Sequence, residues 1–271
     1  MNLEQLAPDT ISQKLEERLQ KLQHVHKEVE KETRRLPDGM LRIAQKTKHV
    51  EYYASSKDNN PGTYITKGKL KVAAHLAQKA YNQHILKLLE REMQAIEKYL
   101  QQTHKGKAIT NYYRTLCTAR RNLIRPVTLL DELYIKEWKN VQWTGLPFDQ
   151  DSPEMFTTNG ERVRSKSEVL ISDSLNRFGI PYRYEYPLQL KSGITLHPDF
   201  LCLNVRTRQE FYWEHFGMMT NSDYAENAIH KLRQYSDNHL YPGINLIITM
   251  ETSTSSLNLK YIEQQIRNYL T

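Results

Sequence analysis

The chain has 271 residues, of which 39% are hydrophobic and 25% are charged, and its mean hydropathy is −0.71. This length is enough for one or two domains with a sizeable core. No apolar run reaches the ~20 residues that a membrane-spanning helix needs, so we expect no membrane association. The first ten residues lack the regions of a secretory signal, and two cysteines, Cys117 and Cys202, exclude a disulfide framework and a cysteine-rich zinc module. We therefore expect a cytoplasmic protein.

Basic residues are concentrated in the first half of the chain. Residues 1–150 contain 26 Lys and Arg against 17 Asp and Glu, whereas residues 151–271 contain 12 against 14. Residues 101–125 contain no acid and carry two tyrosines among their cations. Cations neutralise phosphates and rings stack on bases, so this segment predicts a nucleic-acid-binding surface, with a solvated helix face as the alternative. Its candidate binding residues are Lys105, Lys107, Arg114, Arg120 and Arg121.

The first half predicts a hairpin of two long helices with a small β-meander at its tip. Hydrophobic residues recur every seven positions over 10–36, and a Pro-Asp-Gly turn follows. Residues 40–66 contain three short strand-like segments separated by turns. Helical spacing returns over 69–102, and 108–139 is also expected to be helical. We expect the long helices to pair as a coiled coil, through which the chain would form a homo-oligomer or bind a protein partner.

The second half predicts a different class of structure, so the whole chain is expected to be a two-part α+β protein. A segment rich in Gly, Pro, Asp and Asn predicts a linker over 146–161, between domains at 1–145 and 162–271. The order α-β-β-β-α-β-α after the linker fits one domain with a mixed sheet flanked by helices. The expected elements are a helix over 165–179, strands over 181–190, 194–203 and 210–218, a helix over 223–239, a strand over 243–250 and a helix over 257–270.

Three carboxylates of the second half lie in surroundings that disfavour an ionised group. Asp199 and Glu214 lie in apolar strands, and Glu168 opens the first helix after the linker. Such a carboxylate needs a partner or a metal, because removing it from water is costly. Strand alternation puts Glu214 and His215 on opposite faces, and if the two strands pair, Asp199 and Glu214 can converge. Two carboxylates and a carbonyl oxygen form a hard-ligand site suited to Mg²⁺ or Mn²⁺.

Each acid also has a purely structural interpretation. Ser165 and Glu168 have the spacing of a capping box, in which the glutamate satisfies a backbone donor. Asp199 follows a proline and is compatible with an edge turn, and Glu214 is compatible with a buried ion pair to an arginine. The three acids together, in this strand order, favour the metal site.

The joint pattern resembles the PD-(D/E)XK nuclease superfamily. The resemblance covers about residues 162–250, with Glu168 in RSKSE, Asp199 in HPDF and Glu214 in YWEHFGM, followed by KLRQY. More narrowly, these blocks are similar to an uncharacterised bacterial branch, some members of which are attached to helicases. The resemblance implies a restriction-endonuclease-like core and metal-dependent hydrolysis of phosphodiester bonds in nucleic acid, with DNA as the favoured substrate.

The same resemblance implies a role for each acid. Asp199 and Glu214 would bind Mg²⁺ or Mn²⁺ together with the backbone carbonyl of His215. Glu168 would hold the metal through water or complete a second site. The superfamily pattern has a lysine two residues after the second acid, where this chain has Phe216.

A replacement for the missing lysine is expected on the following helix. Lys231 is the candidate, and Tyr235 lies one turn later on the same face. An ordinary exposed lysine is the alternative. Lys166 and Tyr235 are expected to contact flanking phosphates. Two further residues are expected to support the metal ligands, Glu185 and His197.

Two other functions compete with the nuclease. Loss of the motif lysine at Phe216 favours a catalytically inactive nuclease-fold module that binds nucleic acid or assembles with a partner. The heptad helices favour a structural protein that oligomerises. Dependence on a divalent cation separates the nuclease from the inactive module. The structural protein predicts that deletion of residues 1–100 abolishes self-association, with no catalytic activity to lose.

Overall fold

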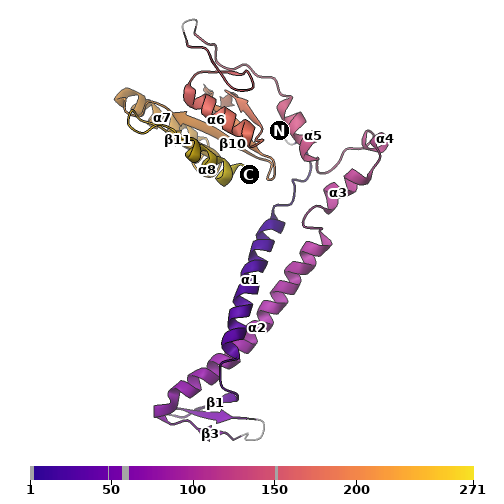
Figure 1. Ribbon diagram of the computed structural model, residues 1–271, viewed down its shortest axis with the longest axis vertical. Coiled ribbons are helices and arrows are strands. Elements are labelled where there is room, and N and C mark those ends of the chain that lie inside the picture. The colour runs from indigo at the N-terminus through magenta and orange to yellow at the C-terminus, as the bar shows by residue number, and fades with distance from the viewer. Residues whose placement is uncertain (1–2, 48, 57–60, 150–151) are drawn as a thin grey trace. The chain divides into compact units, whose positions relative to one another are not determined.

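A computed structural model describes residues 3–47, 49–56, 61–149 and 152–271. The chain separates into two compact units (Figure 1): Asp9–Ala108 forms one, and Met1–Pro8 together with Ile109–Thr271 forms the other. Both helices and sheets are present, as the α+β prediction requires. In the described ranges no helix has the combination of length and apolar composition that crossing a membrane demands.

The smaller unit contains the predicted helical hairpin. Its two long helices lie side by side (Figure 1) and bury Leu22 against Ile96 and Leu100. These contacts come from the heptad-spaced positions of the sequence, so the predicted hairpin is confirmed. The helices are α1 (Ile11–Thr33) and α2 (Leu70–Gln102).

The predicted β-meander is also confirmed in the smaller unit. Its strands form an antiparallel sheet in the order β1-β2-β3. Leu41, Tyr52 and Ala54 pack against Ala73 and Leu76 in the first turns of α2. The elements are β1 (Met40–Gln45), β2 (Val50–Ser55), β3 (Thr63–Tyr64) and the short helix η1 (Lys67–Lys69) that leads into α2.

The larger unit is built on a mixed four-stranded sheet in the order β11-β10-β9-β6. Strand β9 is antiparallel to β6 and β10, whereas β10 and β11 are parallel and are connected through α7. Helices α6 and α8 cover one face, and α5 and α7 pack against the other. The strands are β6 (Tyr182–Tyr184), β9 (Phe200–Asn204), β10 (Gln209–Phe216) and β11 (Leu246–Met250). The helices are α5 (Asp131–Lys139), α6 (Lys166–Arg177), α7 (Ser222–Asp237) and α8 (Leu259–Tyr269).

The predicted strands over 181–190 and 194–203 pair antiparallel, as expected for neighbouring strands joined by a turn, but each is interrupted. The first breaks at Glu185, whose φ of 47° is left-handed and incompatible with an extended strand. The second breaks before Asp199, at a proline that cannot donate a ladder hydrogen bond. The outer pieces form a separate two-stranded sheet, β7 (Leu188–Gln189) with β8 (Thr195–Leu196).

The predicted helix over 108–139 is three short helices. The backbone of Cys117 is extended, with ψ of 156°, and Pro126 lies in the irregular segment that follows. A proline lacks the N–H that a helix interior needs. The three helices are α3 (Ala108–Thr115), α4 (Thr118–Arg121) and α5.

The compact units divide the chain at places other than the predicted domain boundaries. Helix α5 packs Tyr134 and Trp138 against Leu201 and Leu203 of β9. This helix lies within the predicted first domain, 1–145, but belongs with the sheet of the larger unit. The predicted linker 146–161 contains β4 (Met155–Phe156), which pairs with β5 (Arg162–Val163). Phe148 and Met155 of this segment pack against the main core, and residues 150–151 lie outside the described ranges.

Candidate active site

Asp199 directly precedes strand β9, and Glu214 lies in its paired neighbour β10. The register of β9 and β10 pairs Phe200 with Trp213, so the next position places Asp199 across from Glu214. Directly opposite residues point to the same face of a sheet, with Cβ atoms about 4.5–5.5 Å apart. Oδ2 of Asp199 also accepts a hydrogen bond from the backbone N–H of His215, at 2.7 Å. The strands therefore pair as the convergence of the two acids requires.

The electrostatics of this pair are unfavourable to two negative charges. Burial, and then the nearby Glu214 and Glu168, raise the pKa of Asp199 well above its usual 3.8. The N–H of His215 and the ammonium of Lys231 oppose this shift only in part. Burial also raises the pKa of Glu214, although Lys231 and a tyrosine hydroxyl oppose it. Burial is the largest cause of both shifts, and the neighbouring cation and hydrogen-bond donors do not offset it.

Helix α7 supplies the cation and the hydroxyl that reach Glu214. Nζ of Lys231 forms an ion pair with Oε1 of Glu214, and the hydroxyl of Tyr235 donates to Oε2 at 2.6 Å. The two side chains lie four residues apart on one helix face. The Lys231 side chain is 28% exposed and directed at the acid, which is not the arrangement of an ordinary surface lysine.

Two expectations for this region change with the structure. Tyr235 is fully buried and its hydroxyl is committed to Glu214, so its predicted contact with flanking phosphates is wrong. Phe216, at the position of the motif lysine, is only 3% exposed and belongs to the interior. Lys166 is exposed at the first position of α6, as a phosphate contact would require.

Glu168 lies in the first turn of α6, and its capping interpretation is confirmed. Oγ of Ser165 accepts from the Glu168 N–H at 3.1 Å and donates to Oε1 at 2.8 Å. The hydroxyl of Tyr184 donates to Oε2 at 2.7 Å. The same carboxylate contributes to the raised pKa values of both strand acids, so capping leaves it within electrostatic range of them.

Glu185 and His197 support the backbone of Asp199 rather than its carboxylate. The Glu185 N–H donates to the Asp199 carbonyl at 3.0 Å, and Nδ1 of His197 donates to the Glu185 carbonyl at 3.1 Å. The Glu185 carboxylate points elsewhere, to Nε of Arg164 at 2.5 Å. These contacts hold the bend at which Asp199 enters β9.

Sequence reasoning missed Tyr224, which lies seven residues before Lys231 on α7. Its hydroxyl accepts from the Gly217 N–H at 3.2 Å. Burial raises its pKa, and the charges of Asp199 and Glu214 raise it further. The i, i+7 spacing to Lys231 places both residues on one helix face and was the available signal.

A second cluster lies on the opposite face of β10, around His215. Nδ1 of His215 lies 3.0 Å from Oγ1 of Thr249, and Nε2 lies 3.3 Å from Oε1 of Glu251. Glu251 also accepts from Oγ of Ser167 at 2.8 Å and from the Leu257 N–H at 2.9 Å. This cluster links the ends of β10 and β11 to the start of α6, immediately behind the acids.

The predicted basic surface over 101–125 is divided between the two compact units. Lys105 and Lys107 belong to the smaller unit, and Arg114, Arg120 and Arg121 belong to the larger one. Lys105 forms an ion pair with Glu16 at 2.8 Å.

The donor set of the acid cluster fits a hard divalent cation in its chemistry. Asp199 and Glu214 provide carboxylate oxygens, and the His215 carbonyl follows Glu214 in the same strand. Within the described residues, no three His, Cys, Asp or Glu side chains are already arranged to hold a metal ion. The Lys231 ammonium occupies one oxygen of Glu214.

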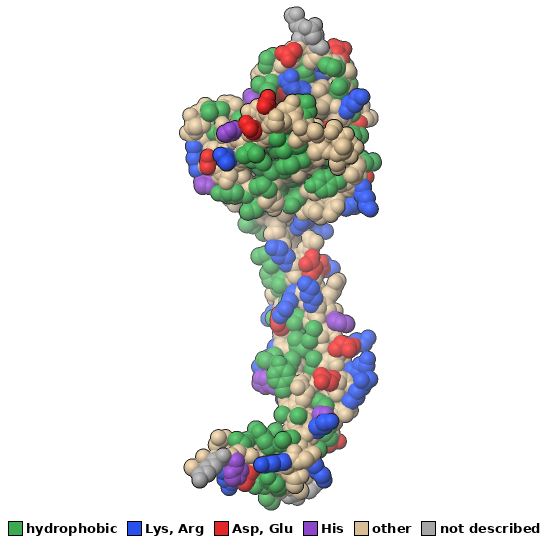
Figure 2. All heavy atoms as spheres, turned by 90° about the vertical axis from the view of Figure 1, so that its left-hand side faces the viewer, with side chains coloured by type: hydrophobic (Ala, Val, Ile, Leu, Met, Phe, Trp, Pro, Cys, Tyr) green, Lys and Arg blue, Asp and Glu red, His purple; other side chains and the backbone are tan. Residues whose placement is uncertain are grey.

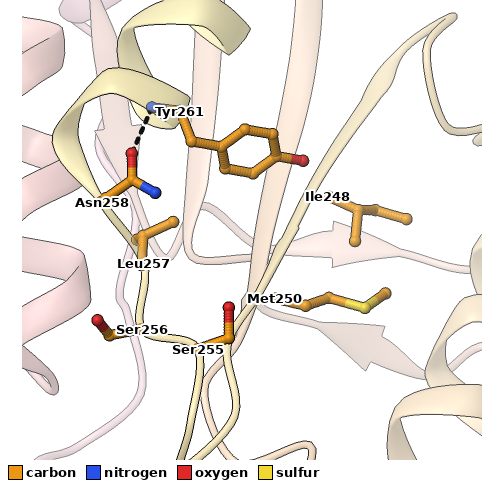
Figure 3. A pocket seen from close by; sticks show the side chains of 7 residues that line it. All are labelled: Ile248, Met250, Ser255, Ser256, Leu257, Asn258 and Tyr261. Carbon is orange, nitrogen blue, oxygen red and sulfur yellow. Dashed lines mark hydrogen bonds between the residues drawn. The ribbon is translucent and has the colours of Figure 1, made fainter.

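The acid cluster is separate from a hollow of about 380 Å³ beside the edge strand β11. None of the acids lines that hollow, shown in Figure 3 with the side chains of Ile248, Met250, Ser255, Ser256, Leu257, Asn258 and Tyr261.

Comparison with known proteins gives little information on function. No protein-family profile and no solved structure matches the chain. A segment of 77 residues, 28% of the chain, is 39% identical to part of the uncharacterized protein MJ1519 of Methanocaldococcus jannaschii. The match spans 6% of the archaeal protein. The name of this relative assigns no activity, so the functional argument rests on the site.

Proposed function

We propose that this protein is a Mg²⁺- or Mn²⁺-dependent nuclease that hydrolyses phosphodiester bonds in DNA, with a restriction-endonuclease-like core. The observation that carries the proposal is the meeting of Asp199, Glu214 and Lys231 at one point of the sheet. With the small β7–β8 pair set aside, the order α6-β6-β9-β10-α7-β11 supports the proposed core, because it is the α-β-β-β-α-β order of the PD-(D/E)XK superfamily that the motifs resemble.

In this proposal the acids bind the metal and the helix residues serve the phosphate. Asp199, Glu214 and the His215 carbonyl provide the ligands, and Glu168 completes the site. The chemistry supplied by the bound cation is polarisation of the scissile phosphate and activation of water. A water oxygen bonds to phosphorus, the bond to one sugar oxygen breaks, and that oxygen leaves protonated as a hydroxyl.

Lys231 and Tyr235 have different roles in this reaction. With Mg²⁺ bound, Glu214 no longer needs Lys231 for charge balance, so the ammonium is available to the negative charge that grows on the phosphate oxygens. Tyr235 is a positioning residue, because its hydroxyl holds Oε2 of Glu214.

DNA cleavage tests the proposal directly. Asp199→Asn keeps the size of the side chain and an acceptor for the His215 N–H, and it removes the charge. We expect this variant to cleave DNA at least about 100-fold more slowly than wild type in Mg²⁺. Cleavage by the wild type should disappear in EDTA. Asp223→Asn, an exposed acid on α7, is the matched control. Equal activity of wild type and Asp199→Asn contradicts the proposal.

One observation favours the inactive nucleic-acid-binding module as a second candidate. The motif-lysine position is a buried phenylalanine, Phe216, which cannot supply a cation. This candidate predicts DNA binding without cleavage and without dependence on divalent cations. The Lys231–Glu214 ion pair fits both candidates, because a buried carboxylate needs a positively charged partner in either.

A further inference from the structure

The outer face of the β1–β2–β3 sheet carries an unusual row of side chains. Leu41, Tyr52 and Ala54 face inward and pack on α2, so their neighbours along each strand face outward. The register places Arg42 opposite Tyr53, and Tyr53 opposite Tyr64. One cationic and two aromatic side chains therefore lie side by side across the three strands.

This row is held in a defined geometry before any partner binds. The Arg42 guanidinium lies 4.2 Å from the centre of the Tyr53 ring, and Tyr53 meets Tyr64 edge-on at 5.6 Å. Nε of Arg42 donates to the Pro61 carbonyl at 3.1 Å, and the Tyr53 hydroxyl donates to Glu51 at 2.8 Å. Tyr64 is nevertheless 50% exposed. A fixed and exposed ring provides contact area at low entropic cost.

The same end of the hairpin carries a large excess of positive charge. Residues 34–79 contain ten Lys and Arg against three Asp and Glu, an excess of +7, which equals the formal net charge of the entire chain. The remainder of the protein is therefore neutral in sum. Figure 2 shows basic and hydrophobic side chains next to each other at this end of the hairpin, in the lower part of the view. Such a charge distribution matches a polyanion.

Three lysines next to the sheet contribute to this excess. Lys67, Lys69 and Lys71 are exposed, and no ion pair is found for them in the described part of the chain. By contrast, Arg18 on α1 forms an ion pair with Glu92 on α2 at 2.8 Å. Lysines at the start of a helix oppose its dipole, so these three do not stabilise α2. Lys67 lies three residues after Tyr64, within about 10 Å along the chain.

We infer that the outer face of the β1–β2–β3 sheet, together with Lys67, Lys69 and Lys71, binds single-stranded nucleic acid. Bases stack on Tyr64 and on the Arg42 guanidinium, and the lysines neutralise the adjacent phosphates. A single strand is favoured over a duplex because only an unpaired base can present its face to an exposed ring. The inference uses the proposed nuclease only in choosing DNA as the probe.

Binding of a labelled single-stranded oligothymidine to the full chain in EDTA tests this inference separately from cleavage. We expect Lys67→Gln/Lys69→Gln/Lys71→Gln to reduce the slope of log affinity against log salt by about 2, since each phosphate contact on a single strand contributes about 0.7. The matched control removes the same charge from exposed positions of the α2 shaft, Lys87→Gln/Arg91→Gln/Lys98→Gln, and leaves the slope unchanged.

A second variant tests the stacking. Tyr64→Ala is expected to weaken single-strand binding about 10-fold and to leave duplex binding unchanged, because one stacked base is lost. Tyr81→Ala, 61% exposed on α2, is the control and has no effect. An equal reduction of the salt slope in the two triple variants, or an equal loss of single-strand and duplex binding in Tyr64→Ala, overturns the inference. Circular dichroism confirms that each variant is folded. Asp199→Asn should lose cleavage and keep this binding. Unchanged cleavage in Asp199→Asn would therefore contradict the proposed nuclease and leave the single-strand site standing.

Discussion

The two faces of β10 carry acid clusters that are balanced in opposite ways. On one face, burial and the charges of neighbouring acids raise the pKa values of Asp199 and Glu214, and the Lys231 ammonium offsets this only in part. On the other face, burial raises the pKa of Glu251, but the N–H of Leu257 and the side chains of Ser167 and His215 more than offset it, so the pKa is lowered. The donors around Glu251 more than compensate for its burial, whereas those around Asp199 and Glu214 do not.

Removing the Lys231 ammonium, which pairs with Glu214, is expected to have the largest effect on DNA cleavage. Lys231→Met should lower the rate of DNA cleavage by about 100-fold, because the charge that develops on the phosphate loses a partner. Arg233→Met, an exposed cation on the same helix, should cleave like wild type. Initial rates at saturating Mg²⁺ make the comparison. Matching rates for the two variants would show that Lys231 only neutralises Glu214 in the metal-free protein.

Neutralising one acid on each face should change stability in opposite directions. Asp199→Asn should raise the free energy of unfolding of the metal-free protein, because a repelled buried charge is removed. Glu251→Gln should lower it by about 1–3 kcal/mol, because three donors lose a charged acceptor. Urea unfolding in EDTA measures both. Equal destabilisation of Asp199→Asn and Glu251→Gln would contradict the expected difference between the two faces.

The contributions of Asp199 and Glu251 to stability should also change with pH in opposite directions. A carboxyl whose pKa is raised by folding stabilises the protein below its usual pKa of 3.8, and this contribution is lost as pH rises through the raised value. A carboxyl whose pKa is lowered, such as Glu251, stabilises above its usual 4.5 and loses that contribution as pH falls. As pH rises above 3.8 towards the raised pKa, the metal-free protein should therefore lose stability through Asp199, by up to about 1.4 kcal/mol per pH unit.

Unfolding midpoints across this pH range, with and without Mg²⁺, check the pH dependence. Asp199→Asn should flatten the decline, and Mg²⁺ should restore stability most at the higher pH, because it binds the ionised folded form. An unchanged slope in Asp199→Asn would place the titrating group elsewhere.

Much of the fold could be predicted from sequence because its signals are local. Heptad spacing gives the α1–α2 hairpin, and strand alternation places Glu214 and His215 on opposite faces of β10. The breaks could not be predicted in the same way. The left-handed backbone of Glu185 is stabilised by Asp199, Arg164 and His197, which are distant or unrelated in pattern. The attachment of α5 to the sheet rests on Trp138 meeting strand residues more than sixty positions later.

The candidate site shows the same division. Residue types and order select Asp199 and Glu214 as candidates, because carboxylates in apolar strands are unusual. Lys231 is a candidate only through the family resemblance, which lacks its motif lysine here. The direction in which each side chain points could not be predicted from the sequence. Tyr235 looked suitable for a phosphate contact, but packing against the sheet buries it completely. Glu251 has no sequence signal at all, since its partners come from three different elements.

The location of a bound divalent cation tests the central claim most directly. Crystals soaked in Mn²⁺ and measured at its absorption edge would reveal the ion by anomalous scattering. The account predicts a peak between the carboxylates of Asp199 and Glu214, with the Lys231 ammonium displaced from Glu214. A map with no peak there, and with Lys231 still paired to Glu214, would contradict it.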